Sequence, residues 1–187
     1  MRIAITGGIG SGKSYVCQLL LKHGIKVYDC DEAAKRLMRT SLSLQHQLMQ
    51  LVGDDVYINK VLQKPVLAKF LLASDENKQA VNDIVHPAVA LDYLKSDYEW
   101  LESAILFDSG FYKRVDFDKI VCVTAPLSIR VERVMQRDNI SQEKALEWIH
   151  RQLPQDEVLS RSDYEIVNDG KQDLEKQITL LLNKIYK

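Results

Sequence analysis

The sequence has almost no net charge and no long apolar run. Lys and Arg number 25 against 26 Asp and Glu, so the formal charge of −1 gives no basic footprint for nucleic acid or for a membrane surface. No apolar run reaches the length of a transmembrane helix, and the first strand pattern begins within two residues of the start, which leaves no room for a signal peptide. We therefore expect a cytoplasmic protein without nucleic-acid or membrane partners.

Cysteine is scarce and unpatterned. Cys17, Cys30 and Cys122 are odd in number, form no C-x-x-C and have no histidine at metal-ligand spacing. They fit small buried apolar residues in a reducing compartment. The sequence also lacks internal repeats, low-complexity tracts and Pro/Ser-rich linkers. A chain of 187 residues with 46% hydrophobic content predicts one compact α/β domain with insertions rather than two independent domains.

Five β-favouring segments alternate with helical segments along the chain. The strands are predicted at residues 3–5, 25–28, 100–107, 119–124 and 164–167. Apolar spacing predicts helices over residues 13–23, 33–38, 44–52, 65–72, 76–98, 127–137, 141–153 and 174–185. Helices of adequate length between strands indicate a parallel, doubly wound sheet, whose ligand site lies beyond the carboxyl ends of the strands.

The region between residues 31 and 100 carries no strand pattern and is interpreted as a helical insertion. Pro65 suits the first turn of its predicted helix, because proline lacks only an N–H that has no partner there. Pro87 falls inside the predicted helix over 76–98 and is expected to kink or split it.

Residues 7–14, Gly-Gly-Ile-Gly-Ser-Gly-Lys-Ser, are the most informative stretch. They fit G-x-x-x-x-G-K-[ST] between a predicted strand and a predicted helix. The glycines let the backbone turn tightly and bring N–H groups against phosphate oxygens, and the helix beginning at Lys13 adds the positive end of its dipole. Lys13 can reach the β- and γ-phosphates, and the Ser14 hydroxyl can ligate Mg²⁺. The sequence predicts a nucleoside triphosphate site.

Other nucleotide-binding classes fit less well. The N-K-x-D and D-x-x-G strings of GTPases do not occur. Gly8, Gly10 and Gly12 miss the G-x-G-x-x-G spacing of dinucleotide-binding proteins. The P-loop by itself does not separate kinases from ATPases.

Asp29 and Asp31 follow the second predicted strand, at the edge of the sheet where the P-loop emerges. A carboxylate there can accept the proton of an acceptor hydroxyl or help to hold Mg²⁺. Asp31 could equally be a cap for the helix that follows, because Asp is a favoured capping residue. Both interpretations stay open at this point.

Arg130, Arg133 and Arg137 recur at spacings that place them near one another on one helix. As a cluster they would neutralise charge on a transferred phosphoryl group. As a solvated stripe they would pair with Glu132 and Asp138. The residues alone do not decide between the two.

Taken in order, these motifs resemble the dephospho-CoA kinase family. The segments that carry the resemblance are residues 5–14, 24, 29–31, 81–87, 105–108, 123–127, 133–138, 152–154 and 163–170, over essentially the whole chain. The resemblance implies a P-loop NTPase-type, three-layer α/β fold with a five-stranded parallel sheet, a helical acceptor-binding insertion and a lid. It also implies ATP-dependent phosphorylation of the ribose 3′-hydroxyl of dephospho-CoA.

The resemblance assigns roles to individual residues. The catalytic residues are expected to be Asp31 as the base, Lys13, Arg133 and Arg137. ATP is expected to contact Gly8, Ile9, Gly10, Ser11, Gly12, Lys13, Ser14, Tyr15 and Asn168, with Mg²⁺ on Ser14. Dephospho-CoA is expected to contact Asp31, His86, Phe107 and Asp108, although His86 could equally be a packed structural residue before Pro87. The expected layout is one kinase domain, with its core at about 1–40, 99–138 and 163–187, the insertion at about 41–98 and the lid at about 139–162.

The chain departs from the family pattern at several positions. Glu102 stands where the family has Asp, and Asp108 stands where it usually has Glu, so both positions keep a carboxylate. Trp148 stands where the family often has Arg, and Arg151, one turn later, is an alternative source of that charge. Val158 replaces a common Lys, and Lys64 corresponds roughly to an Arg. Two other functions stay open: another small-molecule P-loop kinase of the nucleoside or nucleotide type, and a non-catalytic ATP-binding regulator.

Overall fold

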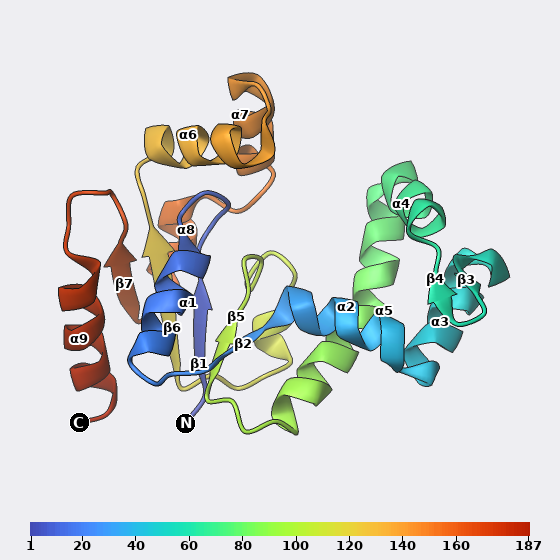
Figure 1. Ribbon diagram of the computed structural model, residues 1–187, viewed down its shortest axis with the longest axis horizontal. Helices are drawn as coiled ribbons and strands as arrows, with labels where there is room; N and C mark the ends of the chain where they lie inside the picture. The colour runs from blue at the N-terminus through green and yellow to red at the C-terminus, as the bar shows by residue number, and fades with distance from the viewer. The chain divides into compact units, whose positions relative to one another are not determined.

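A five-stranded sheet carries the fold. The computed structural model describes residues 1–187, with strand order β2-β5-β1-β6-β7 (Figure 1). The strands are β1 (Ile3–Thr6), β2 (Val27–Asp29), β5 (Trp100–Glu102), β6 (Lys119–Thr124) and β7 (Tyr164–Val167). The central strand β1 pairs in parallel with β5 and β6, and β6 pairs in parallel with β7. The parallel sheet with flanking helices confirms the predicted fold class.

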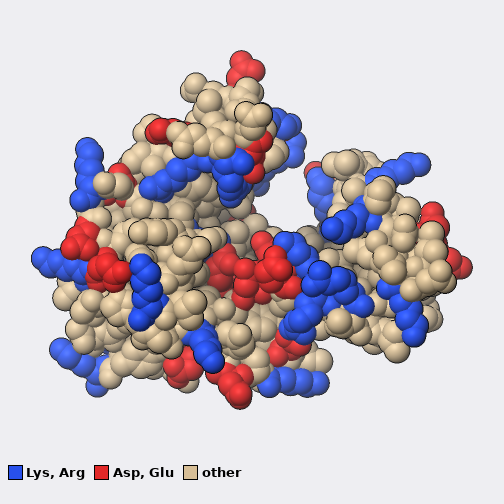
Figure 2. Space-filling view, in the orientation of Figure 1, with Lys and Arg blue, Asp and Glu red and all other residues tan.

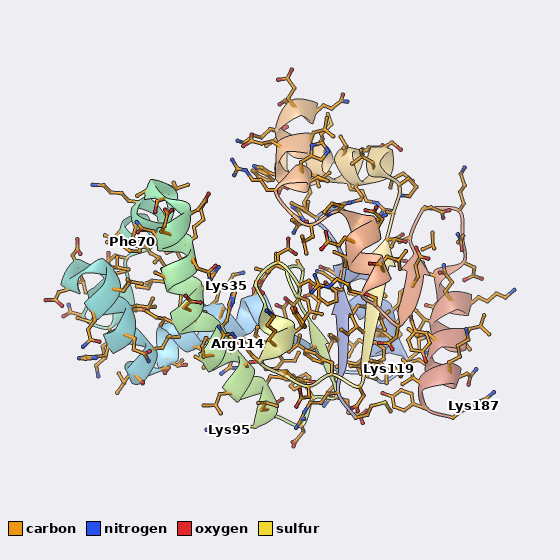
Figure 3. All side chains as sticks on the ribbon, turned by 180° about the vertical axis from the view of Figure 1, so that it is seen from behind. Lys35, Phe70, Lys95, Arg114, Lys119 and Lys187 are labelled. Carbon is orange, nitrogen blue, oxygen red and sulfur yellow. The ribbon has the colours of Figure 1, made fainter.

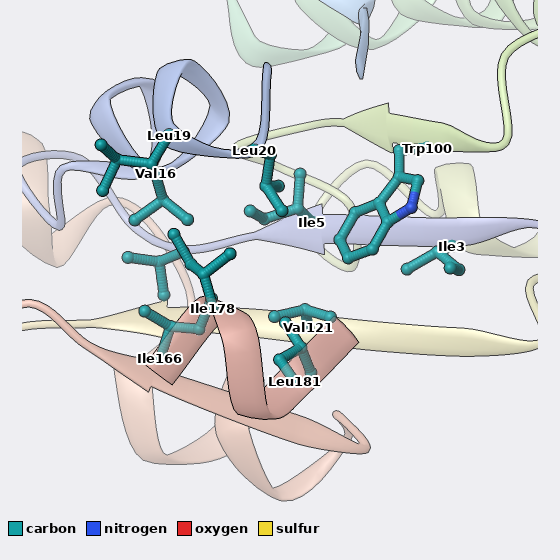
Figure 4. Close-up of a cluster of buried hydrophobic side chains, with 11 residues drawn as sticks. Ile3, Ile5, Val16, Leu19, Leu20, Trp100, Val121, Ile166, Ile178 and Leu181 are labelled. Carbon is teal, nitrogen blue, oxygen red and sulfur yellow. The ribbon is translucent and has the colours of Figure 1, made fainter. Parts of the chain in front are cut away.

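The sheet is buried against helices because its central strands are apolar throughout. All four residues of β1 are buried, as expected for a strand covered on both faces. Helices α1 (Lys13–Lys22) and α9 (Leu174–Ile185) pack against each other over the main core. That core, drawn in Figure 4, consists of Ile3, Ile5, Val16, Leu19, Leu20, Trp100, Val121, Val123, Ile166, Ile178 and Leu181.

Three helices follow β6, and the second and third of them lie in the predicted lid at about 139–162. They are α6 (Leu127–Asp138), α7 (Gln142–His150) and α8 (Gln155–Ser160), and α8 packs on β6. The α6–α7 pair has its own small core of Val131, Val134, Ala145 and Ile149, with Ile9, Met135, Ile140, Leu146 and Trp148 packed against it. Ile9 belongs to the P-loop, so the phosphate-binding loop and the α6–α7 pair share apolar contacts.

Contacts divide the chain into a sheet unit, Met1–Tyr28 with Tyr98–Lys187, and a helical unit, Asp29–Asp97. In the helical unit the long helix α5 (Asp75–Leu94) contacts α2 (Cys30–Thr40), α3 (Leu42–Val52) and α4 (Lys64–Ala73). The helical unit begins before α2, whereas we expected the insertion to begin at about residue 41.

The helical unit contains a small hairpin, and the expectation of no strand between residues 31 and 100 was wrong. After the 3₁₀ turn η1 (Asp54–Val56), strands β3 (Tyr57–Ile58) and β4 (Val61–Leu62) pair in antiparallel fashion. Asn59 and Lys60 both take positive φ, of 50° and 65°, which is the turn geometry that two-residue hairpins favour. Two-residue strands are too short to show a period of alternation, so the sequence pattern could not reveal them.

Three other boundaries differ from the prediction. Helix α5 is not split, and it runs through Pro87 with Val85 and Val89 buried on either side. Tertiary packing along a 20-residue helix therefore outweighs the one hydrogen bond that proline removes. Strand β5 ends at Glu102 rather than at residue 107, and the helix predicted to reach 153 ends at His150, with α8 following as a separate helix.

Charges are mixed over the surface. Figure 2 shows basic and acidic side chains interspersed on the face that it draws, in keeping with the formal charge of −1. At the amino end of β6, Lys119 (labelled in Figure 3) lies 3.3 Å from Asp163. None of the helices combines the length and the apolar character needed to cross a membrane.

Candidate functional site

The P-loop joins β1 to α1 at the carboxyl edge of the sheet. Gly10 and Gly12 take φ values of +80° and +84°, a backbone region that favours glycine. Gly12 is the N-cap of α1 and supplies no side-chain cap. The first N–H groups of α1 are therefore available to an anion, at the positive end of the helix dipole.

The carbonyl side of the loop is held by Arg133 and Asn168. Arg133 Nη1 donates to the carbonyls of Gly10 at 3.3 Å and Ser11 at 3.2 Å. Its Nη2 donates to the backbone O and to Oδ1 of Asn168, at 3.0 and 3.2 Å. The buried Asn168 in turn donates Nδ2 to the Ser11 carbonyl at 2.9 Å. In a trans peptide the N–H points away from the C=O, so holding the Ser11 carbonyl on one side directs the Gly12 N–H to the other, whereas the Ser11 N–H is bonded to the Gly8 carbonyl at 3.0 Å.

Ile9 is held at both of its backbone polar groups. Arg130 Nε donates to the Ile9 carbonyl at 3.0 Å, and the Ile9 N–H donates to Gln152 Oε1 at 2.7 Å. Arg130 comes from α6 and Gln152 from the segment between α7 and α8. Arg130 is 5% exposed, and burial lowers the pKa of its guanidinium. Helix α6 and the segment after α7 thus fix the first half of the P-loop.

Two of the P-loop glycines, Gly10 and Gly12, lie too close to neighbouring residues to carry a side chain. A Cβ at Gly10 would lie 2.5 Å from the backbone oxygen of Arg130, which cannot move aside without shifting α6. A Cβ at Gly12 would collide with Asn168 Nδ2. The P-loop glycines are therefore required by the residues that brace the loop as well as by its turns.

Lys13 forms an ion pair with Glu102. Glu102 ends β5, which is in register with β1 so that Ile5 pairs with Glu102 beside the P-loop. Both side chains are nearly buried, at 10% and 13% exposure, so the pair is shielded from solvent. Glu102 was not among the predicted site residues, although its position at a strand end and its departure from the family pattern were signals that could have identified it.

Phe107 and Asp108 lie in the loop after β5 and contact residues of the predicted lid. Asp108 Oδ1 accepts from the Leu153 N–H at 2.7 Å. The Phe107 ring is 5.3 Å from that of Tyr112, and the Arg161 guanidinium lies 4.2 Å from the centre of the Phe107 ring. A further bond fastens the same region, since Gln155 Oε1 accepts from the Ala125 N–H at 3.1 Å.

The three α6 arginines divide between the two interpretations left open by the sequence. Arg130 and Arg133 face the P-loop, as described above. Arg137 is exposed and pairs with Asp138 at 2.7 Å, as in the solvated stripe. Arg151, the alternative lid charge, pairs with Glu147 on the exposed side of α7.

Asp29, Asp31 and His86 belong to the helical unit. Asp29 is the N-cap of α2, where its side chain accepts from the Glu32 N–H at 2.9 Å. Asp31 lies in the first turn of α2 and is exposed, so the interpretation of Asp31 as the capping residue was wrong. His86 is half-buried on α5 immediately before Pro87.

The residues at the P-loop suit a magnesium–triphosphate ligand. No group of three or more His, Cys, Asp and Glu side chains is placed to hold a metal ion. Mg²⁺ usually takes only one or two protein ligands and completes its shell with phosphate oxygens and water. Ser14 is exposed at the start of α1, and the Glu102 carboxylate lies at Lys13, one residue before it. Both are hard oxygen donors of the kind that Mg²⁺ prefers.

Comparison with known proteins agrees with this geometry. The sequence model of the dephospho-CoA kinase family matches residues 1–173. A dephospho-CoA kinase of Bacteroides fragilis is 40% identical over 193 residues, which cover 100% of this chain and 93% of that protein. The crystal structure of a Thermus thermophilus protein superposes with a TM-score of 0.79 at 32% identity, over 98% of this chain and 97% of that one. Dephospho-CoA kinase from Campylobacter jejuni has the same fold, with a TM-score of 0.69 at 22% identity over 98% and 96% of the two chains.

Proposed function

The chain belongs to the dephospho-CoA kinase family, and from that premise we propose how its own residues carry out the reaction. The enzyme transfers the γ-phosphoryl group of ATP to the ribose 3′-hydroxyl of dephospho-CoA, the last step of coenzyme A biosynthesis. The observation that carries this conclusion is the family match over residues 1–173, which includes the P-loop and its bracing residues.

The P-loop positions the triphosphate. The backbone N–H groups of Gly10, Gly12, Lys13 and Ser14 contact the phosphate oxygens, and Lys13 exchanges its ion pair with Glu102 for the β- and γ-phosphates. Little covalent chemistry is required of the protein in phosphoryl transfer, so rate enhancement rests on positioning and charge neutralisation. The bracing of the loop by Arg130, Arg133 and Asn168 supplies that positioning.

Ser14 and Glu102 are the residues of the protein that would hold Mg²⁺. When bound there, Mg²⁺ would supply positive charge that offsets the negative charge developing on the transferred phosphoryl group. Glu102 would then pair with Lys13 before the nucleotide binds and help to hold Mg²⁺ afterwards. This accounts for a nearly buried carboxylate at the end of the strand beside β1.

Asp31 is proposed to receive the proton of the acceptor hydroxyl. It is exposed at the start of α2 and makes no helix cap, so its carboxylate is available to a ligand. A general base must come within hydrogen-bond reach of the proton that it accepts. The helical region at about 41–98, with His86, is proposed to hold the rest of the acceptor, and Phe107 and Asp108 to border it.

The lid, at about 139–162, is proposed to close over the γ-phosphate and exclude water that would hydrolyse ATP. Arg133 contributes by fixing the P-loop and Asn168, beside the nucleotide. Arg137 contributes directly only if it leaves Asp138, because that ion pair occupies its guanidinium. Tyr15, exposed in the first turn of α1, is proposed to border the nucleotide.

Acceptor-dependent ADP release tests the proposal. Purified protein with ATP and Mg²⁺ is assayed without acceptor, with dephospho-CoA, and with a panel of nucleosides and nucleotides. We expect ADP release with dephospho-CoA only, and loss of turnover in Lys13→Ala with the fold retained. Release with a nucleoside instead would identify another small-molecule kinase. Tight ATP binding without any acceptor-dependent release would identify a regulator.

A further inference from the structure

Arg130 is a buried cation without an acidic partner. It is 5% exposed, and its hydrogen bond goes to the neutral Ile9 carbonyl at 3.0 Å. Arg36 and Arg137, by contrast, pair with the carboxylates of Asp92 and Asp138. An uncompensated charge in a poorly hydrated site is unfavourable unless a counter-charge is supplied.

The place of Arg130 indicates what that counter-charge is. Its guanidinium packs against Gly8, where a Cβ would collide with Nη2, and it binds the carbonyl of Ile9. Both residues are in the P-loop. No peptide bond of the chain is cis, so the Gly10 N–H, which shares a peptide group with the Ile9 carbonyl, points away from Arg130. Arg130 therefore holds the back of the peptide group whose N–H is presented to phosphate.

We propose that Arg130 is a positioning residue of the nucleotide site, a fixed positive charge whose counter-charge is the bound triphosphate and which acts through the Ile9–Gly10 peptide group. The proposal rests on the nucleotide site of the proposed function. It does not depend on the identity of the acceptor. The spacing in the sequence did not distinguish Arg130 from Arg133 and Arg137. Neither Arg130 nor Gln152 was among the predicted site residues.

The charge and the hydrogen bond have separable effects. The hydrogen bond to Ile9 fixes the direction of the Gly10 N–H, and the charge adds attraction for phosphate that water does not screen fully at a buried site. Arg133 differs, because it is only partly buried and divides its donors among the carbonyls of Gly10, Ser11 and Asn168. Gln152 complements Arg130 by holding the Ile9 N–H without adding charge.

The experiment compares Arg130→Gln with Arg130→Lys. Gln keeps a side-chain N–H donor and removes the charge, whereas Lys keeps the charge. ATP dissociation constants are measured by isothermal titration calorimetry, and melting temperatures are measured without nucleotide. We expect Arg130→Gln to weaken ATP binding by about tenfold to a hundredfold, the range of one charge-assisted interaction. Arg130→Lys should recover most of that loss, and the melting temperature without nucleotide should change little.

Arg2→Gln is the matched control, because it removes an arginine charge just before β1, at the end of the strand opposite the P-loop. It should bind ATP as the unaltered protein does. A lower melting temperature of Arg130→Gln with unchanged ATP affinity would overturn the proposal, since Arg130 would then be a packing residue only. Equal loss of affinity in Arg130→Lys and Arg130→Gln would overturn it as well. Failure of dephospho-CoA to stimulate ADP release would instead refute the proposed function and leave this comparison standing.

Discussion

At the scale of single residues, the P-loop is a strand–helix turn braced from its carbonyl side. Arg130, Arg133 and Asn168 bind loop carbonyls, and Lys13 lies at the start of α1. The donors that bind the Ile9 and Ser11 carbonyls direct the N–H groups of Gly10 and Gly12 to the opposite side of the loop, where the nucleotide is proposed to bind. The sequence predicted the loop from its glycines and Lys13. It could not predict the bracing, because Arg130 and Arg133 lie more than a hundred residues away and their partners are backbone atoms.

The Lys13–Glu102 pair predicts a competition between Glu102 and phosphate. Glu102→Gln should tighten binding of Mg²⁺-free ATP several-fold, because Lys13 no longer has to leave a carboxylate. The same change should lower the melting temperature, since it leaves Lys13 without its counter-charge. Calorimetric titration in the presence of EDTA measures the affinity. Glu102→Asp retains the charge and serves as control, and weaker binding by Glu102→Gln would contradict the competition.

Gly12 combines a left-handed backbone with a close neighbour. Gly12→Ala should destabilise the fold by about 2 to 4 kcal/mol, of which roughly half is backbone strain and half the lost Asn168–Ser11 hydrogen bond. Gly170→Ala is the matched control, because Gly170 has φ of +76° with nothing within 4 Å of an added Cβ. Urea unfolding of both variants separates strain from collision. Equal losses at the two positions would contradict the bracing role of Asn168.

Cys122 predicts a pH dependence of stability. Burial in β6 raises the pKa of its thiol to about 12, with Glu165 adding to the effect. The unfolded thiol ionises near its ordinary value of 9.0. The folded state therefore holds the proton more tightly, and the stabilisation is lost as pH rises above 9. The difference in free energy of unfolding between the unaltered protein and Cys122→Ala should shrink by about 1.4 kcal/mol between pH 7.5 and 10. A difference independent of pH would contradict the burial of this thiol.

At the scale of elements, three side-chain-to-backbone bonds fasten the segment between α7 and α8, in the predicted lid, to the rest of the sheet unit. Gln152 binds the Ile9 N–H, Asp108 binds the Leu153 N–H, and Gln155 binds the Ala125 N–H. In each bond one of the two residues lies within residues 152–155: Gln152, Leu153 or Gln155. The sequence predicted a helix running through this segment. The structure instead ends α7 at His150, and the intervening turn is what allows these bonds to form.

Asp108→Ala should loosen this segment, because the Leu153 N–H loses its acceptor. Trp148, half-buried on α7, is the reporter, since the only other tryptophan, Trp100, is fully buried in the sheet core. We expect a red shift of tryptophan emission and faster proteolysis between residues 150 and 155. Asp108→Asn keeps an oxygen acceptor and should resemble the unaltered protein. An unchanged emission spectrum in Asp108→Ala would show that Asp108 does not hold the lid.

Helices and strands were predicted correctly where the apolar pattern extends over many residues, and they were missed where it covers only a few. The continuous apolar run over Lys119–Thr124 and the helical spacing over Leu174–Ile185 match β6 and α9 closely. The β3–β4 hairpin and α8 were missed, because strands of two residues and a helix of six contain too little of a period to be recognised. Of the two outcomes expected at Pro87, a kink or a split, the split does not occur, and local chemistry alone could not reveal that packing keeps the helix continuous.

At the scale of the whole molecule, one sequence builds a sheet unit that carries the P-loop and a helical unit that follows β2. Asp29 ends β2 and caps α2, so it is the residue at which the chain passes from one to the other. The fold class and the nucleotide site could be predicted from strand spacing and one motif. The pairing of Glu102 with Lys13 could not, because register between β1 and β5 is a property of the assembled sheet.

The most direct test of the central claim is the identity of the product. The protein is incubated with ATP, Mg²⁺ and dephospho-CoA, and the acceptor is recovered for mass spectrometry and phosphorus NMR. We predict that it gains one phosphate, carried as a monoester on the ribose 3′-oxygen, in equal amount to the ADP formed. ADP accompanied by free phosphate and unaltered dephospho-CoA, or a phosphate at another position, would contradict the account.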